Sequence, residues 1–151
     1  MIRWRQSADD KAIVELVRTQ LVPISPWQHP PESRLSEDIK NRLRRGPTLV
    51  ASRSRDSSPF GFLHMELQGT TLFIDLLAVD GSFQNKHWGS ELMNEAEQYG
   101  REQGCTIARV YVDESNSKGL RFYERLGYTK VSHIKELKVN ELIKSLQRFW
   151  S

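Results

Sequence analysis

The fold is decided by the stretch LLAVDGSFQNKHWGSELM at residues 76–93. It reads as an apolar strand, a short polar loop and the start of an amphipathic helix. At such a junction the first N–H groups of the helix have no intrahelical partners, and they lie at the positive end of the helix dipole. The stretch is therefore a candidate binding site for a phosphate or pyrophosphate group.

A second stretch, NSKGLRFYERLGY at residues 116–128, makes this interpretation more specific. Together the two stretches resemble the GNAT superfamily of acyl-CoA N-acyltransferases. The family's loop reads Gln/Arg-x-x-Gly-x-Gly/Ala, and the positions in register with it are Gln84, Lys86, Trp88 and Gly89. Its later segment reads roughly Asn-x-x-Ala/Gly-x-x-x-Tyr-x-x-Leu-Gly-Phe/Tyr, which the second stretch matches at every spaced position.

The resemblance is strong over residues 72–131, looser over residues 1–67 and poor after His133. One residue departs from the pattern, because His87 stands where the family prefers the first glycine of the loop. A histidine would be strained there if the position required a positive φ. We expect the first helical turn to begin at this residue, which would avoid the strain.

The resemblance implies an α/β fold, α+β by some schemes, in a single domain over residues 1–151. It implies a mixed, mainly antiparallel central sheet flanked by helices, with a splayed pair of strands that forms the acyl-CoA cleft. Apolar periodicity predicts strands near residues 2–5, 48–52, 60–67, 72–79, 106–112 and 128–134. It predicts helices near residues 7–21, 33–45, 88–103 and 115–125.

The chain end, residues 134–151, is atypical of the family. Its apolar residues, from Leu142 to Trp150, follow helical spacing and predict an amphipathic helix from Glu141 onward. An apolar stripe near a chain end needs a partner. We expect this helix either to pack on its own sheet or to form the seam of a homodimer.

The resemblance also implies how an acyl-CoA is bound. Backbone amides of the loop would hold the pyrophosphate, with added charge from Lys86 or His87, and the strand before the loop would bind the pantetheine arm through its main chain. An ordinary strand-to-helix turn is the alternative. The implied residues are Leu77, Ala78, Val79, Gln84, Asn85, Lys86, His87, Trp88, Gly89, Ser90, Asn116 and Tyr123.

In the family, a tyrosine at the position of Tyr123 protonates the leaving thiolate, and a phenol is chemically suited to that role. The alternative is an aromatic residue packed under the sheet. Asp75 matches an acidic position of some members and is our candidate base, directly or through a water. Two-residue alternation puts it on the strand face of Leu77 and Val79. His64 and Glu66 are rival bases, and Asp75 could equally have no role.

Trp27 and His29 lie in a proline-rich segment where the family builds its acceptor pocket. They are candidate substrate-binding residues, although Trp27 could instead be tucked into the core. Cys105 opens an apolar strand and is expected to be a buried, inert thiol. No Cys/His spacing in the sequence suggests a zinc site, so we expect no metal.

Composition narrows the function further. The chain has 151 residues, is 38% hydrophobic and 27% charged, and carries a formal net charge of +3. These values fit one soluble domain that binds an anionic cosubstrate, and no apolar run or signal core suggests a membrane partner or export. The arginines of residues 42–55 have no nucleic-acid recognition motif and read as a solvated face. The single cysteine fits the reducing cytoplasm.

The leading hypothesis is an N-acetyltransferase that moves an acetyl group directly from acetyl-CoA to a primary amine of a small molecule or peptide. The alternative is a catalytically silent acyl-CoA-binding sensor or partner module. The sequence does not identify the acceptor, because function depends on a pocket and not on the fold.

Overall fold

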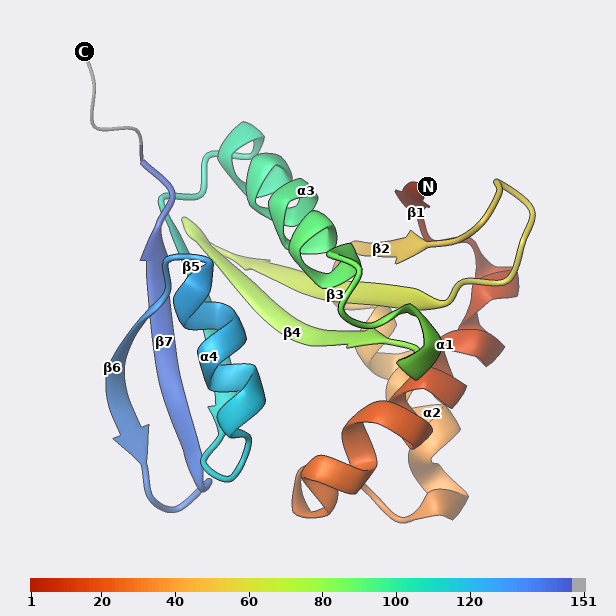
Figure 1. The fold of residues 1–151 in the computed structure, drawn as a ribbon, viewed down its shortest axis with the longest axis horizontal. Coiled ribbons are helices and arrows are strands. Elements are labelled where there is room, and N and C mark those ends of the chain that lie inside the picture. The colour runs from red at the N-terminus through yellow and green to blue at the C-terminus, as the bar shows by residue number, and fades with distance from the viewer. Residues whose placement is uncertain (148–151) are drawn as a thin grey trace.

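A computed structural model of the chain describes residues 1–147. In this part of the chain, seven strands form one sheet in the spatial order β1-β2-β3-β4-β5-β7-β6 (Figure 1). Every neighbouring pair is antiparallel except β4 and β5, which run parallel, so the expected mixed and mainly antiparallel sheet is confirmed. The strands are β1 (Ile2–Trp4), β2 (Thr48–Ala51), β3 (Gly61–Gln68), β4 (Thr71–Val79), β5 (Ile107–Asp113), β6 (Thr129–Ile134) and β7 (Val139–Ser145).

Helices cover both faces of the sheet. The α-helices are α1 (Asp10–Leu16), α2 (Glu32–Leu43), α3 (Trp88–Glu102) and α4 (Ser117–Arg125). The shorter helical turns are η1 (Ser7–Asp9), the π-helical η2 (Val17–Leu21), η3 (Val22–Ile24), η4 (Pro26–Gln28) and η5 (Gly81–Phe83). One core lies between the sheet and α1 with α2, and the other lies under α3 and α4. No helix within residues 1–147 combines the length and the apolarity needed to cross a membrane.

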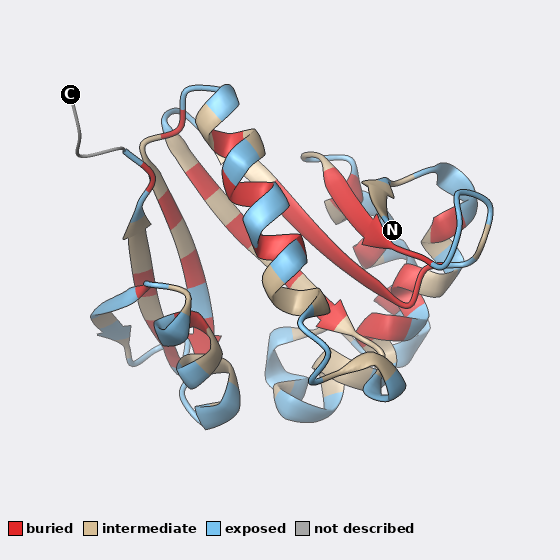
Figure 2. Cartoon of the chain, turned by 45° about the horizontal axis from the view of Figure 1, so that its top comes forward, coloured by how far each residue is buried: buried red, intermediate tan, exposed pale blue. Residues whose placement is uncertain are grey.

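Helix α3 illustrates how the sequence pattern produces this packing. Its buried residues Leu92, Met93 and Ala96 recur with helical spacing and pack in the core that lies against the sheet. Figure 2 shows the resulting alternation of buried and exposed bands along α3. Glu91 and Glu95 lie on the exposed side, as the pattern predicts. Burying a side chain the size of leucine stabilises the fold by about 1.5–3 kcal/mol, so this face alone anchors the helix firmly.

The parallel strands β4 and β5 separate part-way along their length. They pair only between Thr71–Ile74 and Ile107–Val110. Beyond Ile74 the strands diverge (Figure 1), and the end of β4 keeps a partner strand only on its β3 side. This is the splayed strand pair that the family resemblance implies, and it opens a cleft in the middle of the sheet.

A β-bulge at Asp75 sits where the strands begin to separate. His64 of β3 pairs with Leu76 and Met65 pairs with Ile74, which leaves Asp75 as the extra residue. A bulge changes which face the following side chains occupy. Asp75 and Leu76 therefore both face α2, whereas Leu77 packs in the core under α3. The expectation that Asp75 shares a face with Leu77 is wrong, because simple alternation ignores the inserted residue.

The chain end corrects a second expectation. Residues predicted to form a helix from Glu141 instead form most of β7, which inserts between β5 and β6. Leu142 and Leu146 are buried in the core of their own chain, so they are not available as a dimer seam. Central pairing with two strands satisfies the backbone of β7 on both edges, which overrides a helical pattern in the side chains. Phe149 and Trp150 lie outside the described residues.

Candidate active site

Two pockets open at the split between β4 and β5. The larger, about 560 Å³, runs along the end of β4, the loop before α3, and α4. The smaller, about 280 Å³, lies on the other side of the split, beneath η2 to η4. The residues that line both pockets are Leu21, Ile24, Leu77, Asn116 and Tyr123. Ligands in the two pockets could therefore meet at this junction.

The larger pocket is lined by the residues that the resemblance implied for acyl-CoA binding. All of them line it except Lys86. The nearby cations that line it are instead Lys118 and Arg125 of α4. A Cβ atom at Gly89 would lie 3.2 Å from the Phe122 ring, so glycine lets the start of α3 approach α4 closely.

His87 adopts a left-handed backbone conformation, with φ 68° and ψ 8°, and α3 begins only at Trp88. The expectation that the helix starts at His87 is therefore wrong. The turn needs a positive φ at this point, which is the reason for the family's glycine and a source of backbone strain for a histidine. Asn85, two residues earlier, also has a positive φ of 61°. The loop thus reaches its shape without the family's glycine.

Gln84 bridges three parts of the larger pocket. Its side-chain amide nitrogen donates to the backbone carbonyl of Val79 at 2.7 Å and to Oε1 of Gln20 at 2.9 Å. The Lys118 ammonium donates to Gln84 Oε1 at 3.5 Å. Since Val79 lies on the splayed half of β4, where β5 does not pair with it, its carbonyl oxygen accepts from a side chain that lines the pocket.

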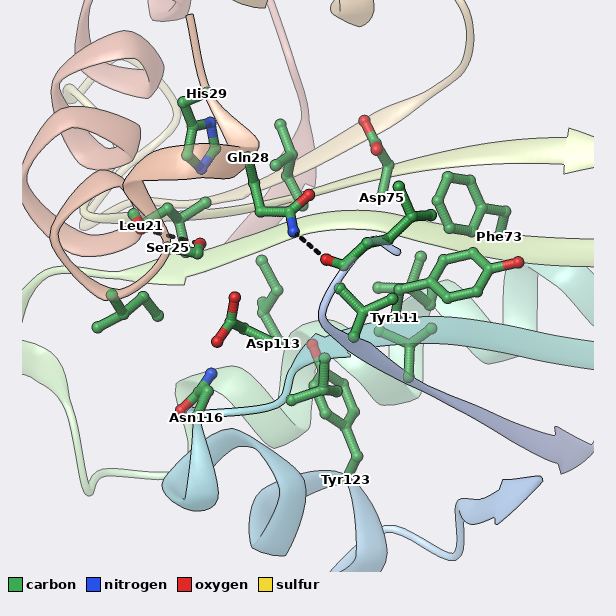
Figure 3. A pocket seen from close by; sticks show the side chains of 18 of the residues that line it. Leu21, Ser25, Gln28, His29, Phe73, Asp75, Tyr111, Asp113, Asn116 and Tyr123 are labelled. Carbon is green, nitrogen blue, oxygen red and sulfur yellow. Dashed lines mark hydrogen bonds between the residues drawn. The ribbon is translucent and has the colours of Figure 1, made fainter. Parts of the chain in front are cut away.

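Tyr123 and Asn116 occupy the junction of the two pockets. Tyr123 packs edge-on against Phe122 and Tyr128, is only 9% exposed, and directs its hydroxyl into the smaller pocket (Figure 3). Burial raises the pKa of its phenol, so the group keeps its proton near neutral pH. Asn116 caps α4, because its Oδ1 accepts a hydrogen bond of 2.9 Å from the N–H of Gly119.

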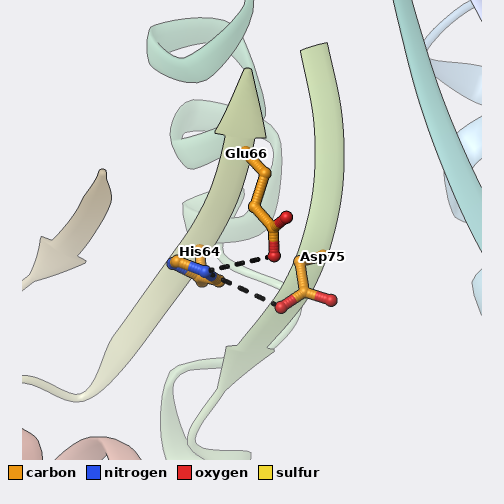
Figure 4. A group of neighbouring side chains, drawn as sticks. All are labelled: His64, Glu66 and Asp75. Atoms are coloured by element: carbon orange, nitrogen blue, oxygen red, sulfur yellow. Dashed lines mark ion pairs between the residues drawn. The ribbon is translucent and has the colours of Figure 1, made fainter. Parts of the chain in front are cut away.

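Asp75 lines the smaller pocket but already has a partner. The Arg42 guanidinium donates from Nη2 to Oδ1 at 2.6 Å and from Nε to Oδ2 at 3.2 Å. His64 Nε2 lies 3.7 Å from Asp75 and 3.9 Å from Glu66 (Figure 4). Histidine and two carboxylates could hold a metal ion, but the guanidinium beside Asp75 disfavours a second cation there.

His64 is fully buried and is held on its other side by Thr48, whose hydroxyl lies 2.8 Å from Nδ1. Burial is the main influence on its pKa and lowers it, although the neighbouring Asp75 acts in the opposite direction. The imidazole is therefore neutral near pH 7. The imidazole packs against Asp75 on one side, and Arg42 pairs with the Asp75 carboxylate on the other.

The two residues expected to bind the acceptor are separated by the structure. His29 lines the smaller pocket, its Nδ1 is buried without a partner in the described residues, and burial lowers its pKa. Trp27 does not line either pocket. The residue is 52% exposed and its ring lies under the Lys138 ammonium, 5.5 Å from the ring centroid, so it is not tucked into the core. Next to it, Gln28 donates to the Leu137 carbonyl at 2.8 Å.

Comparison with known proteins decides the family. The model of the acetyltransferase (GNAT) family matches residues 11–128. Acetyltransferase Atu2258 of Agrobacterium fabrum is 30% identical over 116 residues, which cover 77% of this chain and 80% of that protein. The chain belongs to the GNAT acetyltransferase family. It is an acyl-CoA-dependent N-acetyltransferase, with acetyl-CoA as its co-substrate.

Solved structures share the GNAT fold over the whole domain. An aminoglycoside 6'-N-acetyltransferase complexed with coenzyme A has a TM-score of 0.83 at 14% identity, covering 100% of this chain and 99% of that chain. The PaiA N-acetyltransferase from Thermoplasma acidophilum, in complex with coenzyme A, has a TM-score of 0.79 at 21% identity, covering 96% and 99%. At these identities the likeness establishes the fold alone.

Several residues of this GNAT site were missed from the sequence. Arg42 was read as part of a solvated face, yet it pairs with Asp75 across the smaller pocket. Asp113, which also lines that pocket, directly follows the strand predicted over residues 106–112 and was assigned no role. Gln20 lies in a segment that was predicted to be helical from the spacing of its apolar residues, which gives polar residues no role. Its contact with Gln84 joins residues 64 positions apart, which no local pattern reveals.

Proposed function

We propose that this GNAT enzyme transfers an acetyl group directly to a primary amine of a small molecule or peptide. In this proposal acetyl-CoA occupies the larger pocket and the amine enters through the smaller one. The observation that carries the proposal is the shared junction, where Tyr123 and Asn116 line both pockets. Holding two reactants at one point lowers the entropic part of the barrier.

The larger pocket has the chemistry that an acyl-CoA requires. The Val79 carbonyl already accepts a hydrogen bond from the Gln84 carboxamide, which stands in for an amide of a pantetheine arm. The start of α3, with Lys118 and Arg125 nearby, suits an anionic group such as a pyrophosphate. When bound, acetyl-CoA supplies the acetyl thioester. The chain's part is to hold it against the open edge of β4.

Tyr123 and Asp75 are the proposed acid and base. The Tyr123 hydroxyl keeps its proton near neutral pH and faces the junction, where it can protonate a leaving thiolate. Asp75 faces the smaller pocket with both oxygens engaged by Arg42. Its role is therefore proposed as indirect, through a water that receives the proton of the acceptor ammonium. Arg42 fixes the carboxylate in place for this purpose.

The test is amine-dependent release of coenzyme A by wild type and by Tyr123→Phe. We expect kcat to fall by about 100- to 10,000-fold, the usual contribution of general acid catalysis, with the Kd for acetyl-CoA unchanged. Asp75→Asn should also lower kcat. Asp38→Asn is its matched control, because Asp38 lies 4.0 Å from the same Arg42 but is more exposed. Equal activity of wild type and Tyr123→Phe would show that the Tyr123 hydroxyl is not the general acid.

The same assay separates this proposal from a silent acyl-CoA sensor. Such a sensor would bind acetyl-CoA but release no coenzyme A with any amine of a broad panel. The left-handed His87 in the loop is the feature that favours a sensor, because strain there affects the fit of the pyrophosphate. The buried, protonated Tyr123 at the junction favours catalysis.

A further inference from the structure

Asp113, the last residue of β5, has one carboxylate oxygen without a partner in residues 1–147. Its Oδ1 accepts hydrogen bonds from the backbone N–H of Ser115 at 2.9 Å and from the Ser115 hydroxyl at 2.6 Å. These bonds fix the side chain. Its Oδ2 is buried and makes no hydrogen bond, and the residue as a whole is 8% exposed. A buried charged oxygen is costly unless something pairs with it, so a ligand is the natural partner.

The carboxylate of Asp113 points into the smaller pocket, on the side facing Leu21 and Ser25 (Figure 3). It does not line the larger pocket, whereas Tyr123 and Asn116 line both. Asp113 therefore faces the acceptor side of the junction and not the side proposed for acetyl-CoA. Its partner would be a part of the acceptor away from the reacting nitrogen.

The other charged groups of the smaller pocket do not neutralise Asp113. Arg42 is committed to Asp75, and these two charges cancel. His29 is neutral near pH 7, because burial lowers its pKa. Tyr111, two residues before Asp113 on β5, lines the same pocket beside Phe73, with the ring centroids 5.8 Å apart. A negative charge and an aromatic wall together favour an alkylammonium ligand.

We propose that Asp113 binds a second, non-reacting ammonium group of the acceptor, so that the preferred acceptors are diamines or polyamines. The inference rests on the proposed function and names its substrate class. The reacting nitrogen must be uncharged when it attacks, and so it cannot keep an ion pair with a carboxylate through the reaction. A second ammonium keeps its charge throughout. Asp113 is thus a specificity-determining residue, distinct from the proposed acid and base.

The test is calorimetric titration of the full chain, saturated with coenzyme A, with putrescine and with butylamine. These probes have the same carbon chain and differ in the second ammonium. We expect putrescine to bind about 10- to 100-fold more tightly, the range of a hydrogen bond to a charged group. In Asp113→Asn, whose Oδ1 can still accept from Ser115, the two affinities should become equal within about threefold.

Glu114→Gln is the matched control, because Glu114 is an exposed neighbour that pairs with His133 outside the pocket. This variant should keep the preference for putrescine. Equal binding of the two amines by wild type would by itself overturn the inference, whatever the variants show. A preference that survives in Asp113→Asn would overturn it as well. A preference lost in that variant, but without transfer to any amine, would support the ammonium site and refute the proposed function instead.

Discussion

Removing the hydroxyl of Tyr128 should destabilise the fold measurably, because this group satisfies a buried carboxylate. Tyr128 is 3% exposed and donates a hydrogen bond of 2.8 Å to Oε2 of Glu97 on α3. Glu97 is itself 2% exposed, and its other oxygen accepts from the Lys144 ammonium of β7 at 2.8 Å. The cluster thereby joins α3 to β7 and to the start of β6.

The expected magnitude follows from the charge and burial of the acceptor. Tyr128→Phe leaves Glu97 Oε2 buried with no donor, and a hydrogen bond to a charged group contributes about 1.5–3 kcal/mol. We therefore expect the free energy of unfolding to fall by about 2 kcal/mol. For a domain of this size, Tm should fall by about 4–8 °C. The matched control is Tyr111→Phe, because Tyr111 is 42% exposed, and the free energy of unfolding of this variant should stay within about 0.5 kcal/mol of wild type.

The assay is urea unfolding followed by both far-ultraviolet circular dichroism and tryptophan fluorescence. Coincident transitions with equal m-values for wild type and both variants would justify comparison of their midpoints. If Tyr128→Phe were as stable as Tyr111→Phe, the buried cluster would not contribute to stability, and the reasoning from burial would be refuted.

Three further outcomes are expected. The folded-state pKa of His64 is lowered mainly by burial, so stability that is present above its ordinary pKa of 6.5 should be lost as pH falls through the folded-state value. In urea titrations at successive pH values, the free energy of unfolding of His64→Gln should therefore fall less steeply with decreasing pH than that of the control His133→Gln. Identical pH dependences of the two variants would contradict this. Leu142→Ala should lower the free energy of unfolding by about 2–5 kcal/mol, against less than about 0.5 for the exposed Leu137→Ala, and a small effect at Leu142 would argue against a buried β7. His87→Gly should raise the free energy of unfolding by about 1 kcal/mol by relieving a left-handed backbone, which His87→Ala should not do, so similar stabilities of the two variants would refute that strain.

Much of the fold could be predicted because local pattern and tertiary packing agree. The apolar spacing of Leu92 and Ala96 matches the face that α3 buries, and the strands before it were located to within a residue or two. The chain end failed for the opposite reason. Its side chains follow a helical pattern, yet β7 gains its stability from pairing with β5 and β6, which lie far away in the sequence.

The site residues were likewise predicted where local sequence was informative and missed where contacts between distant residues decide. Residues in the two quoted stretches, such as Gly89 and Tyr123, were assigned to it because their spacing resembles the family's motifs, and the structure brings them to one cleft. Asp75 was placed on the wrong face, since a bulge adds one residue that no alternation shows. Arg42 and Asp113 were missed because charged residues on a helix or a strand end usually face solvent. Only the fold turns them toward a common pocket.

The central claim is that the cleft between β4 and β5, beside the loop before α3, holds acetyl-CoA. Its most direct test is calorimetric titration of the full chain with acetyl-CoA, with Gly89→Arg as the blocked control. A Cβ at this position would lie 3.2 Å from the Phe122 ring, and both residues line the larger pocket, so an arginine side chain here would crowd that pocket. We predict micromolar binding by wild type and none by Gly89→Arg with its fold intact by circular dichroism. Absence of binding by wild type, or equal binding by both proteins, would contradict the claim.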